Sequence, residues 1–280
     1  MQDLSSAVAV VTGASRGVGR GIALELGAAG ATVYVTGRSV DASDAPDELS
    51  GTVTGTADAV TDAGGDGIAV ACDHTDDAAV AALAERIDDE HGRVDVLVNN
   101  VWGGYEEYDE TFDAPFWEQP VERWDAMFDV GVRAHFTTTR ALASLLFAAD
   151  DALVVTISSG DGDRYRGNVP YDVAKTADDR LGKAMAYELR GRGIASVVLH
   201  PGFTRTERVV AAFESTGEAV PETAHSPAFV GRAVVALATD PDVFDRSGDV
   251  RRVGELAREY DFADVDGTQP EPFDLDTPEL

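Results

Sequence analysis

The residues with the clearest chemical potential are Tyr171 and Lys175, which are four positions apart. Four-residue spacing places both side chains on the same face of a helix. An ammonium group beside a phenol stabilises the phenolate form. A tyrosine with such a neighbour can donate a proton to, or accept one from, a carbonyl or alcohol oxygen near neutral pH.

Ser158 is the third candidate catalytic residue, thirteen positions before Tyr171. It ends a predicted strand over residues 152–158, so its hydroxyl could orient the same substrate oxygen. A Tyr-x-x-x-Lys pattern alone is common and more typical of a pair on a helix surface. The serine at a strand end and a glycine-rich turn upstream make the combination specific. We therefore predict that Ser158, Tyr171 and Lys175 are catalytic.

The glycine-rich turn follows the first predicted strand and has the spacing G-x-x-x-G-x-G. Glycine allows a sharp turn and a close approach of the backbone to a pyrophosphate, and the helix that follows presents free N–H groups and a positive dipole end. In this position the turn predicts a dinucleotide site. Its predicted contacts are Gly13, Ser15, Arg16, Gly17, Val18 and Gly19.

The second predicted strand ends at Gly37-Arg38. A fold that prefers NAD usually has an acidic residue here, which binds the ribose 2′-hydroxyl. An arginine suits a 2′-phosphate instead, and Arg16 supplies a second cation from the glycine turn. We therefore predict NADP(H) rather than NAD(H). The alternative is that Arg38 pairs with a nearby aspartate, as surface arginines commonly do.

Polar residues also end the third and fourth predicted strands. Asp73 could bind the adenine amino group or cap the next helix, and the sequence supports both interpretations equally. Asn99 and Asn100 could bridge strands or face the cofactor. We include Asp73 and Asn99 among the predicted cofactor contacts.

Short apolar runs alternate with helical patterns, and these elements must position the residues above. Several runs are continuously apolar, which is typical of parallel strands buried on both faces. Helical periodicity marks residues 18–26, 80–87, 121–149 and 171–190, with Thr75 as a possible cap of the second. The alternation predicts an α/β fold with a single Rossmann-type doubly wound parallel sheet and helices on both faces. The predicted strands are residues 7–12, 31–36, 67–72, 94–99, 152–158 and 194–200, with a seventh near 249–253.

No linker or internal repeat divides the chain, so residues 1–267 are expected to form one dinucleotide-binding catalytic domain. Residues 40–56 are polar and are expected to form a surface excursion. The acidic, proline-bearing residues 268–280 are expected to form a weakly ordered tail.

The 280-residue chain carries 51 acidic and 22 basic residues, a net charge of −29, and its lysines are Lys175 and Lys183 alone. Such a charge disfavours nucleic acids and anionic membranes as partners. With so few lysines, it indicates a surface adapted to very high salt and hence a halophilic source. The single Cys72 excludes a disulfide framework, and the histidines show no ligand spacing, so no metal is expected. We find no signal peptide or long apolar stretch and expect a cytoplasmic protein.

The chain resembles the short-chain dehydrogenase/reductase family over roughly residues 7–255. The resemblance implies hydride transfer between a nicotinamide and a carbonyl/alcohol pair, in homodimers or homotetramers packed through two long helices. It also implies that Lys175 and Tyr171 contact the cofactor and that Pro201, Gly202, Thr204 and Thr206 lie near the nicotinamide. Short segments such as 116–118 and 168–171 are similar to one branch of the family, the relatives of dehydrogenase/reductase member 1. The matching pieces are Thr12–Gly19, Asp73, Asn99-Asn100-Val101, Ser158, Tyr171-x-x-x-Lys175 and Pro201-Gly202.

Two departures from the family pattern lie near the predicted site. Gly131 replaces an asparagine that, in many members, helps to hold a water near the catalytic lysine. A glycine within a helix costs about 1 kcal/mol relative to alanine, so something should offset it. The explanation is either a water site or kink beside Lys175, or close packing of a neighbouring helix. Val101-Trp102 replaces the usual Ala-Gly and brings bulk close to the cofactor pocket.

Aromatic side chains suggest a fairly apolar ketone or aldehyde as substrate, although packing under the loop or at a subunit contact is the better explanation for any single ring. The main alternative function is a catalytically weak protein that senses NADP(H). A sugar-nucleotide epimerase is disfavoured by the glycine spacing. The aromatic residues are Trp102, Tyr105, Tyr108, Phe112, Phe116, Trp117, Phe203 and Phe213.

Overall fold

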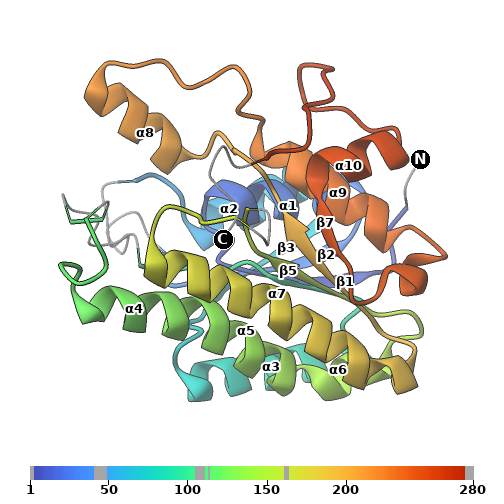
Figure 1. The fold of residues 1–280 in the computed structure, drawn as a ribbon. Helices are drawn as coiled ribbons and strands as arrows, with labels where there is room; N and C mark the ends of the chain where they lie inside the picture. The colour runs from blue at the N-terminus through green and yellow to red at the C-terminus, as the bar shows by residue number, and fades with distance from the viewer. Residues whose placement is uncertain (1–2, 41–48, 105–110, 113, 161–163, 275–280) are drawn as a thin grey trace.

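One parallel sheet of seven strands forms the centre of the molecule, in the order β3-β2-β1-β4-β5-β6-β7 (Figure 1). The computed structural model describes residues 3–40, 49–104, 111–112, 114–160 and 164–274. Each predicted strand overlaps an observed one with bounds that differ by a few residues, so the predicted doubly wound sheet is confirmed. The strands are β1 (Val8–Thr12), β2 (Thr32–Gly37), β3 (Asp66–Ala71), β4 (Val96–Asn99), β5 (Leu153–Ile157), β6 (Ala195–His200) and β7 (Val250–Arg252).

Helices cover both faces of the sheet (Figure 1). The predicted helix at residues 121–149 is present but is divided by a π-helical segment, η2, and by a turn at Leu142. The α-helices are α1 (Gly17–Ala28), α2 (Val53–Asp62), α3 (Asp77–His91), α4 (Val121–Met127), α5 (Ala134–Ala141), α6 (Ala143–Ala148), α7 (Val169–Leu189), α8 (Glu207–Thr216), α9 (Pro227–Ala238) and α10 (Val253–Glu259). The remaining segments are η2 (Phe128–Arg133) and the 3-10 helices η3 (Arg190–Arg192) and η4 (Val243–Arg246).

Two details of the sequence-based predictions are wrong. Asp76, not Thr75, caps α3, because its carboxylate accepts a hydrogen bond from the backbone N–H of Ala78. The expected excursion over residues 40–56 ends early, since Thr52 caps α2 and Val53 begins it. Residues 41–48 of that segment lie outside the described residues.

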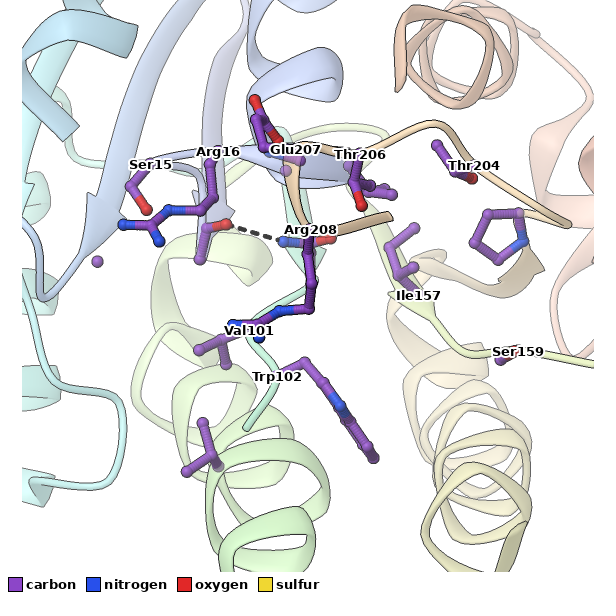
Figure 2. Close-up of a pocket in the computed structure, with 18 of the residues that line it drawn as sticks. Ser15, Arg16, Val101, Trp102, Ile157, Ser159, Thr204, Thr206, Glu207 and Arg208 are labelled. Atoms are coloured by element: carbon purple, nitrogen blue, oxygen red, sulfur yellow. Dashed lines mark hydrogen bonds between the residues drawn. The ribbon is translucent and has the colours of Figure 1, made fainter. Parts of the chain in front are cut away.

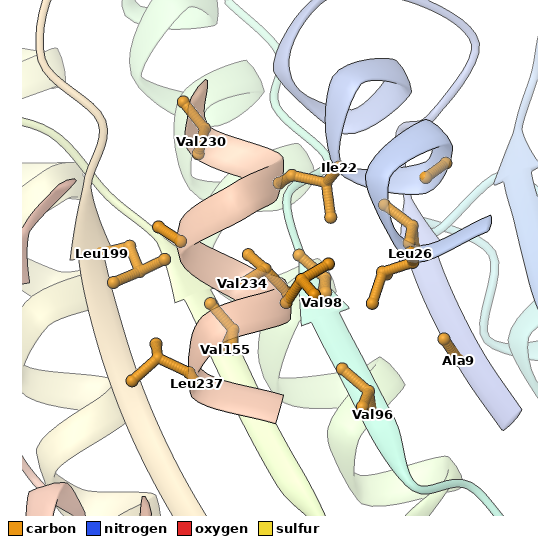
Figure 3. Close-up of a cluster of buried hydrophobic side chains, with 14 of the residues drawn as sticks. Ala9, Ile22, Leu26, Val96, Val98, Val155, Leu199, Val230, Val234 and Leu237 are labelled. Atoms are coloured by element: carbon orange, nitrogen blue, oxygen red, sulfur yellow. The ribbon is translucent and has the colours of Figure 1, made fainter. Parts of the chain in front are cut away.

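Alternating side chains of the strands divide the core into two layers. Ala9 and Val11 pack against α1, α2 and α9 on one face, whereas Val8 and Val10 pack toward α3 and α6 on the other. Figure 3 shows the first layer, where side chains of α1 and α9 meet over β1, β4, β5 and β6. Burial on both faces explains why these strands are continuously apolar.

Helices α1 and α9 cross at very short range. A Cβ atom at Gly21 would lie 2.5 Å from the carbonyl carbon and oxygen of Pro227, and one at Gly231 would lie 2.6 Å from the carbonyl oxygen of Gly21. These obstacles are backbone atoms, which cannot rotate away as a side chain can. The two glycines therefore set the distance between the helices.

We expect Gly21→Ala to lower the free energy of unfolding by about 2 kcal/mol or more, because the added methyl group overpacks this crossing. Denaturant unfolding in molar KCl measures the effect. The matched control is Gly191→Ala, at an exposed position with no atom within 4 Å of the added Cβ. A similar loss of stability in both variants would contradict the packing argument.

The order of the strands reverses between β1 and β4, because the chain continues outward to β2 and β3 on one side and to β5, β6 and β7 on the other. In open α/β sheets, ligands bind at the carboxyl ends of the strands beside such a reversal. Among the described residues, no helix is both long and apolar enough to cross a bilayer.

Candidate active site

A cavity of about 550 Å³ lies at the carboxyl ends of the strands, beside the reversal between β1 and β4 (Figure 2). Its walls come from the glycine turn, the ends of β2, β4 and β5, helix α7 and the segment after β6. The structure thus brings together residues that are up to 260 positions apart, from Gly13 to Phe273. The predicted residues that line the cavity are Gly13, Ser15, Arg16, Gly17, Val18, Gly19, Arg38, Asp73, Ser158, Tyr171, Lys175, Pro201, Gly202 and Thr204.

Asn99 is the one predicted site residue that does not line the cavity. It is fully buried, and its side-chain amide donates a hydrogen bond of 2.8 Å to Thr139 Oγ1. The neighbouring Asn100 lines the cavity and donates to the carbonyl oxygens of Thr12 and Gly13 at 2.8 and 3.1 Å. The end of β4 therefore supports the glycine turn through the second asparagine of the pair.

The backbone of the glycine turn lies directly against the end of β4. Gly13 has a φ of 65°, and a Cβ atom on it would lie 2.8 Å from the Cα atom of Val101. A Cβ atom on Gly19 would lie 2.5 Å from the carbonyl oxygen of Gly13. The turn is compact for lack of side chains, so its backbone is open to a ligand in the cavity.

Glu207, at the start of α8, binds the N-terminus of α1. Its Oε2 atom accepts a hydrogen bond of 2.9 Å from the backbone N–H of Gly17. The first N–H groups of a helix and its dipole favour an anion at this place. A carboxylate already satisfies that preference here, which fits a site for a phosphate group. Sequence reasoning missed Glu207, since 190 residues separate it from Gly17.

Arg16, Arg38 and Asp73 lie at one end of the cavity. Arg16 donates hydrogen bonds to Ser39 Oγ and to the carbonyl oxygen of Gly51 at 3.5 and 3.3 Å. Burial raises the pKa of Asp73, but hydrogen bonds from Thr75 and the charge of Arg38 outweigh burial and leave this pKa below its ordinary value. Asp73 therefore organises the turn before α3 and is ionised beside Arg38.

Local sequence explains how Tyr171 and Lys175 are presented. Asn168 caps α7 by accepting a hydrogen bond of 3.1 Å from the backbone N–H of Tyr171. The Asn168 amide in turn donates to Gln119 Oε1 and to the carbonyl oxygen of Phe112 at 3.0 and 2.8 Å. This anchored cap fixes the first turn of α7, which carries Tyr171, and Lys175 follows one turn later.

Ser158 and Lys175 are joined directly. The Ser158 hydroxyl donates a hydrogen bond of 3.0 Å to the carbonyl oxygen of Lys175, and the Lys175 ammonium donates one of 3.3 Å to the carbonyl oxygen of Ile157. The end of β5 is therefore attached to α7 at the candidate catalytic residues.

Behind Lys175 lies a buried charged network that the sequence did not indicate. Asp178 Oδ2 accepts from the Lys175 ammonium at 3.2 Å, and Asp178 Oδ1 lies 2.9 Å from His135 Nδ1. The side chains of Asp178 and His135 are fully buried. Burial raises the pKa of Asp178, but the charges and hydrogen bonds of His135 and Lys175 have the larger, opposite effect. The pKa of Asp178 therefore lies below its ordinary value. The network thus contains an ionised aspartate.

Gly131 lies in η2, and the atoms nearest to a Cβ added there belong to the indole of Trp102. The same indole covers the Lys175 ammonium, with 3.7 Å between Nζ and the ring centroid. It also meets the Tyr171 ring edge to face, with 5.5 Å between centroids. Both departures from the family pattern therefore meet at one side chain.

Several cavity residues were not among the predicted contacts. Arg166 is buried and binds the carboxylates of Asp172 and Asp179 at 3.0 and 3.2 Å. Phe273 lines the cavity although it lies beyond residue 267. A Cβ atom added at Gly202 would lie 3.0 Å from the Cβ atom of Phe273. These contacts depend on side-chain directions that spacing along the chain does not reveal. The additional lining residues include His74, Arg166, Glu207, Arg208 and Phe273.

The aromatic residues considered for the substrate separate into groups. Trp102 and Phe203 line the cavity, and Phe213 packs on Phe203 with 6.2 Å between ring centroids. Phe116 and Trp117 are exposed and do not line the cavity. Phe112 lies under the guanidinium group of Arg123. Tyr105 and Tyr108 lie outside the described residues.

Comparisons with known proteins agree with this geometry. The family model for short chain dehydrogenases matches residues 7–216. The mouse protein named dehydrogenase/reductase SDR family member 1 is 43% identical over 271 residues, which cover 93% of this chain and 83% of the mouse protein.

Two solved structures have a similar fold. A short-chain dehydrogenase from Mycobacterium thermoresistibile has a TM-score of 0.82 at 24% identity and covers 99% of this chain and 96% of its own. A metagenomic short-chain oxidoreductase in complex with NADP has a TM-score of 0.69 at 30% identity, with coverage of 89% and 97%. The chain therefore resembles short-chain dehydrogenases both in its sequence motifs and in its overall fold.

Proposed function

Because the chain belongs to the short-chain dehydrogenase family of oxidoreductases, we propose that it transfers a hydride between NADP(H) and a carbonyl/alcohol pair. The observation that carries this proposal is the convergence of Ser158, Tyr171 and Lys175 on the cavity that the glycine turn also lines. A binding protein without turnover would need the turn but not the three catalytic side chains.

The cavity residues fit a dinucleotide. The N-terminus of α1 binds an anion, the Glu207 carboxylate, where a pyrophosphate is expected. Arg16 and Arg38 would hold the adenosine end, and Tyr171 and Lys175 the nicotinamide end, with Pro201, Gly202 and Thr204 beside it. The bound NADPH supplies the hydride.

The proton chemistry belongs to the chain's own residues. In the reductive direction, the Tyr171 hydroxyl donates a proton to the carbonyl oxygen of the substrate. The Ser158 hydroxyl, which donates to the carbonyl oxygen of Lys175 in this structure, turns toward the substrate oxygen and orients it. The Lys175 ammonium stabilises the resulting phenolate, because an opposite charge nearby favours the ionised form.

The preference for NADP(H) rests on the cations at the end of β2. Arg38 follows Gly37 there, and no acidic residue occupies the position that binds a ribose 2′-hydroxyl in NAD-dependent folds. Both Arg16 and Arg38 line the cavity. The similar metagenomic oxidoreductase was solved with NADP, which supports the same assignment.

Arg38→Asp is expected to weaken NADPH binding at least about tenfold, because a charge-assisted hydrogen bond to a phosphate contributes about 1.5–3 kcal/mol. NADH affinity should stay equal or improve. Titration of both cofactors at one fixed salt concentration measures the change. The control is Arg140→Asp, an exposed charge reversal on α5 outside the cavity. An unchanged preference in Arg38→Asp would contradict the proposed role of Arg38 in binding the 2′-phosphate.

The substrate is proposed to be a fairly apolar ketone or aldehyde, since Trp102, Val130 and Phe203 contribute apolar surface to the cavity. A homodimer or homotetramer is proposed through α4, α5 and α7. This proposal is supported by the large apolar side chains that these helices expose, Trp124, Phe136 and Val173 among them.

The decisive assay follows NADPH oxidation with a panel of ketones and aldehydes. It is run in molar KCl, because the net charge of −29 indicates a protein adapted to high salt. We expect turnover of apolar carbonyl compounds. Tight NADPH binding without turnover of any of these compounds would instead support the alternative function, a protein that senses NADP(H).

A further inference from the structure

We propose that Trp102 is a positioning residue for Lys175 and that Gly131 serves to leave room for its indole. The inference rests on the proposed function, in which Lys175 assists Tyr171. It assigns one joint role to the two departures from the family pattern: the indole forms the wall that holds the ammonium group in place.

Three groups surround the Lys175 ammonium among the described residues. Oxygens of Asp178 and Ile157 lie 3.2 and 3.3 Å away, and the indole face of Trp102 lies 3.7 Å away, measured to its centroid. The side chain of Lys175 is 6% exposed. An ammonium group has three N–H donors. One binds the Asp178 carboxylate and one the Ile157 carbonyl oxygen, so the third can donate to a ligand in the cavity. An aromatic face attracts a cation strongly where water is excluded.

Trp102 touches both partners of the catalytic pair. Its ring meets the Tyr171 ring at an interplanar angle of 87°. Figure 2 shows the Trp102 side chain extending between the green helical segment that includes η2 and the yellow helix α7. A displaced indole would therefore change the surroundings of the phenol and the ammonium together.

Gly131 determines whether the indole can lie there. A Cβ atom at this position would be 2.7 Å from Cζ3 and 2.9 Å from Cε3 of Trp102. A rigid bicyclic ring between two helices cannot yield as the end of a flexible side chain can. Any side chain at position 131 would thus displace the ring, which explains a buried glycine within a helical segment.

The backbone beside Trp102 is anchored to the same network. The carbonyl oxygen of Val101 lies 3.0 Å from His135 Nε2, and the N–H of Val101 donates to Thr12 Oγ1 at 3.0 Å. His135 Nδ1 in turn binds the carboxylate that holds Lys175. A closed series of contacts therefore runs from Lys175 through Asp178, His135 and Val101 to Trp102 and back to Lys175.

The test distinguishes the effect of the aromatic face of Trp102 from the effect of its side-chain volume. Trp102→Leu keeps an apolar side chain but removes the face, and Trp102→Phe restores a face. We expect Trp102→Leu to lower kcat about tenfold and to move the pH profile of kcat/KM to higher pH. Trp102→Phe should recover kcat to within about threefold of the wild type. If Trp102→Leu keeps kcat and the pH profile of the wild type, the proposal is wrong.

The link to Gly131 is tested by a double-mutant cycle. Gly131→Ala should lower kcat about tenfold in the wild type but less than twofold in a Trp102→Ala background, because the two sites act through one contact. Equal factors in both backgrounds would show that Gly131 acts without Trp102. Denaturant unfolding of each variant verifies that it is folded.

A second measurement needs no turnover. Lys175 and Lys183 are the only lysines of the chain, and Lys183 is exposed, so acylation by an activated ester followed by mass spectrometry compares them directly. We expect Trp102→Ala to raise the labelling rate of Lys175 relative to Lys183 at least about fivefold, since the aromatic wall is gone. An unchanged ratio contradicts the proposal even if the wild type reduces no carbonyl compound, whereas a raised ratio with no turnover contradicts only the proposed function.

Discussion

Tyr171→Phe is expected to lower kcat by a factor of about 10² to 10⁴, the range that a positioned general acid contributes. The substitution removes one hydroxyl group and keeps the ring, which meets the indole of Trp102 edge to face. The free energy of unfolding should therefore change little. Steady-state kinetics with a carbonyl compound that the wild type reduces measure kcat, and denaturant unfolding measures the stability.

The control for this substitution is Tyr187→Phe on the same helix, at an exposed position outside the cavity. It removes the same hydroxyl group from α7 and should leave kcat within about twofold of the wild type. If Tyr171→Phe also kept kcat within that range, the phenol would not be the proton donor.

Asp178→Asn is expected to lower the free energy of unfolding by about 3–5 kcal/mol, as is typical when one partner of a buried ion pair is removed. The asparagine has nearly the same shape, but it turns an N–H donor toward one of two groups that need an acceptor, Lys175 or His135. Denaturant unfolding in molar KCl measures the loss. Glu188→Gln, at an exposed position on the same helix, is the matched control.

The pH dependence of this loss follows from the lowered pKa of Asp178. A carboxyl group whose folded pKa lies below its unfolded value stabilises the protein above the unfolded pKa of about 3.9. That stabilisation is lost as the pH falls through the folded value. The wild type and Asp178→Asn should therefore differ most near neutral pH and approach each other in acid. A difference in stability that persists undiminished at acidic pH would contradict an ionised Asp178.

The fold was predictable because its strands are apolar on both faces. Val8 and Val10 face one layer of the core and Ala9 and Val11 the other, so the run carries no polar interruption. The start of α2 was not predictable from composition, since the polar stretch before it contains both the Thr52 cap and the first helical turn. Local hydrogen bonds, rather than polarity, decide where that helix begins.

Those parts of the candidate site that depend on residues close together in the chain could also be predicted from the sequence. Tyr171 and Lys175 are one helical turn apart, and the glycine turn is a single segment, so both patterns survive in the linear sequence. Tyr171, Lys175 and the predicted contacts of the glycine turn line the cavity, and their roles remain proposals.

The contacts behind the site could not be read in the same way. Trp102 and Gly131 are 29 positions apart, and their contact depends on a π-helical segment and on the direction of one indole ring. Asp178 resembles any acidic residue in a chain with 51 of them, yet its carboxylate is fully buried. Only the packed structure distinguishes it from the solvated charges.

The central claim is that this cavity transfers a hydride while Tyr171 moves the proton. The most direct measurement uses NADPH dideuterated at C4 with the best carbonyl substrate of the panel in molar KCl, followed by mass spectrometry of the product. We predict one deuterium at the carbinol carbon with the wild type, and at least about a hundredfold slower transfer with Tyr171→Phe. NADPH that binds tightly but leaves no deuterium in any product would contradict the claim.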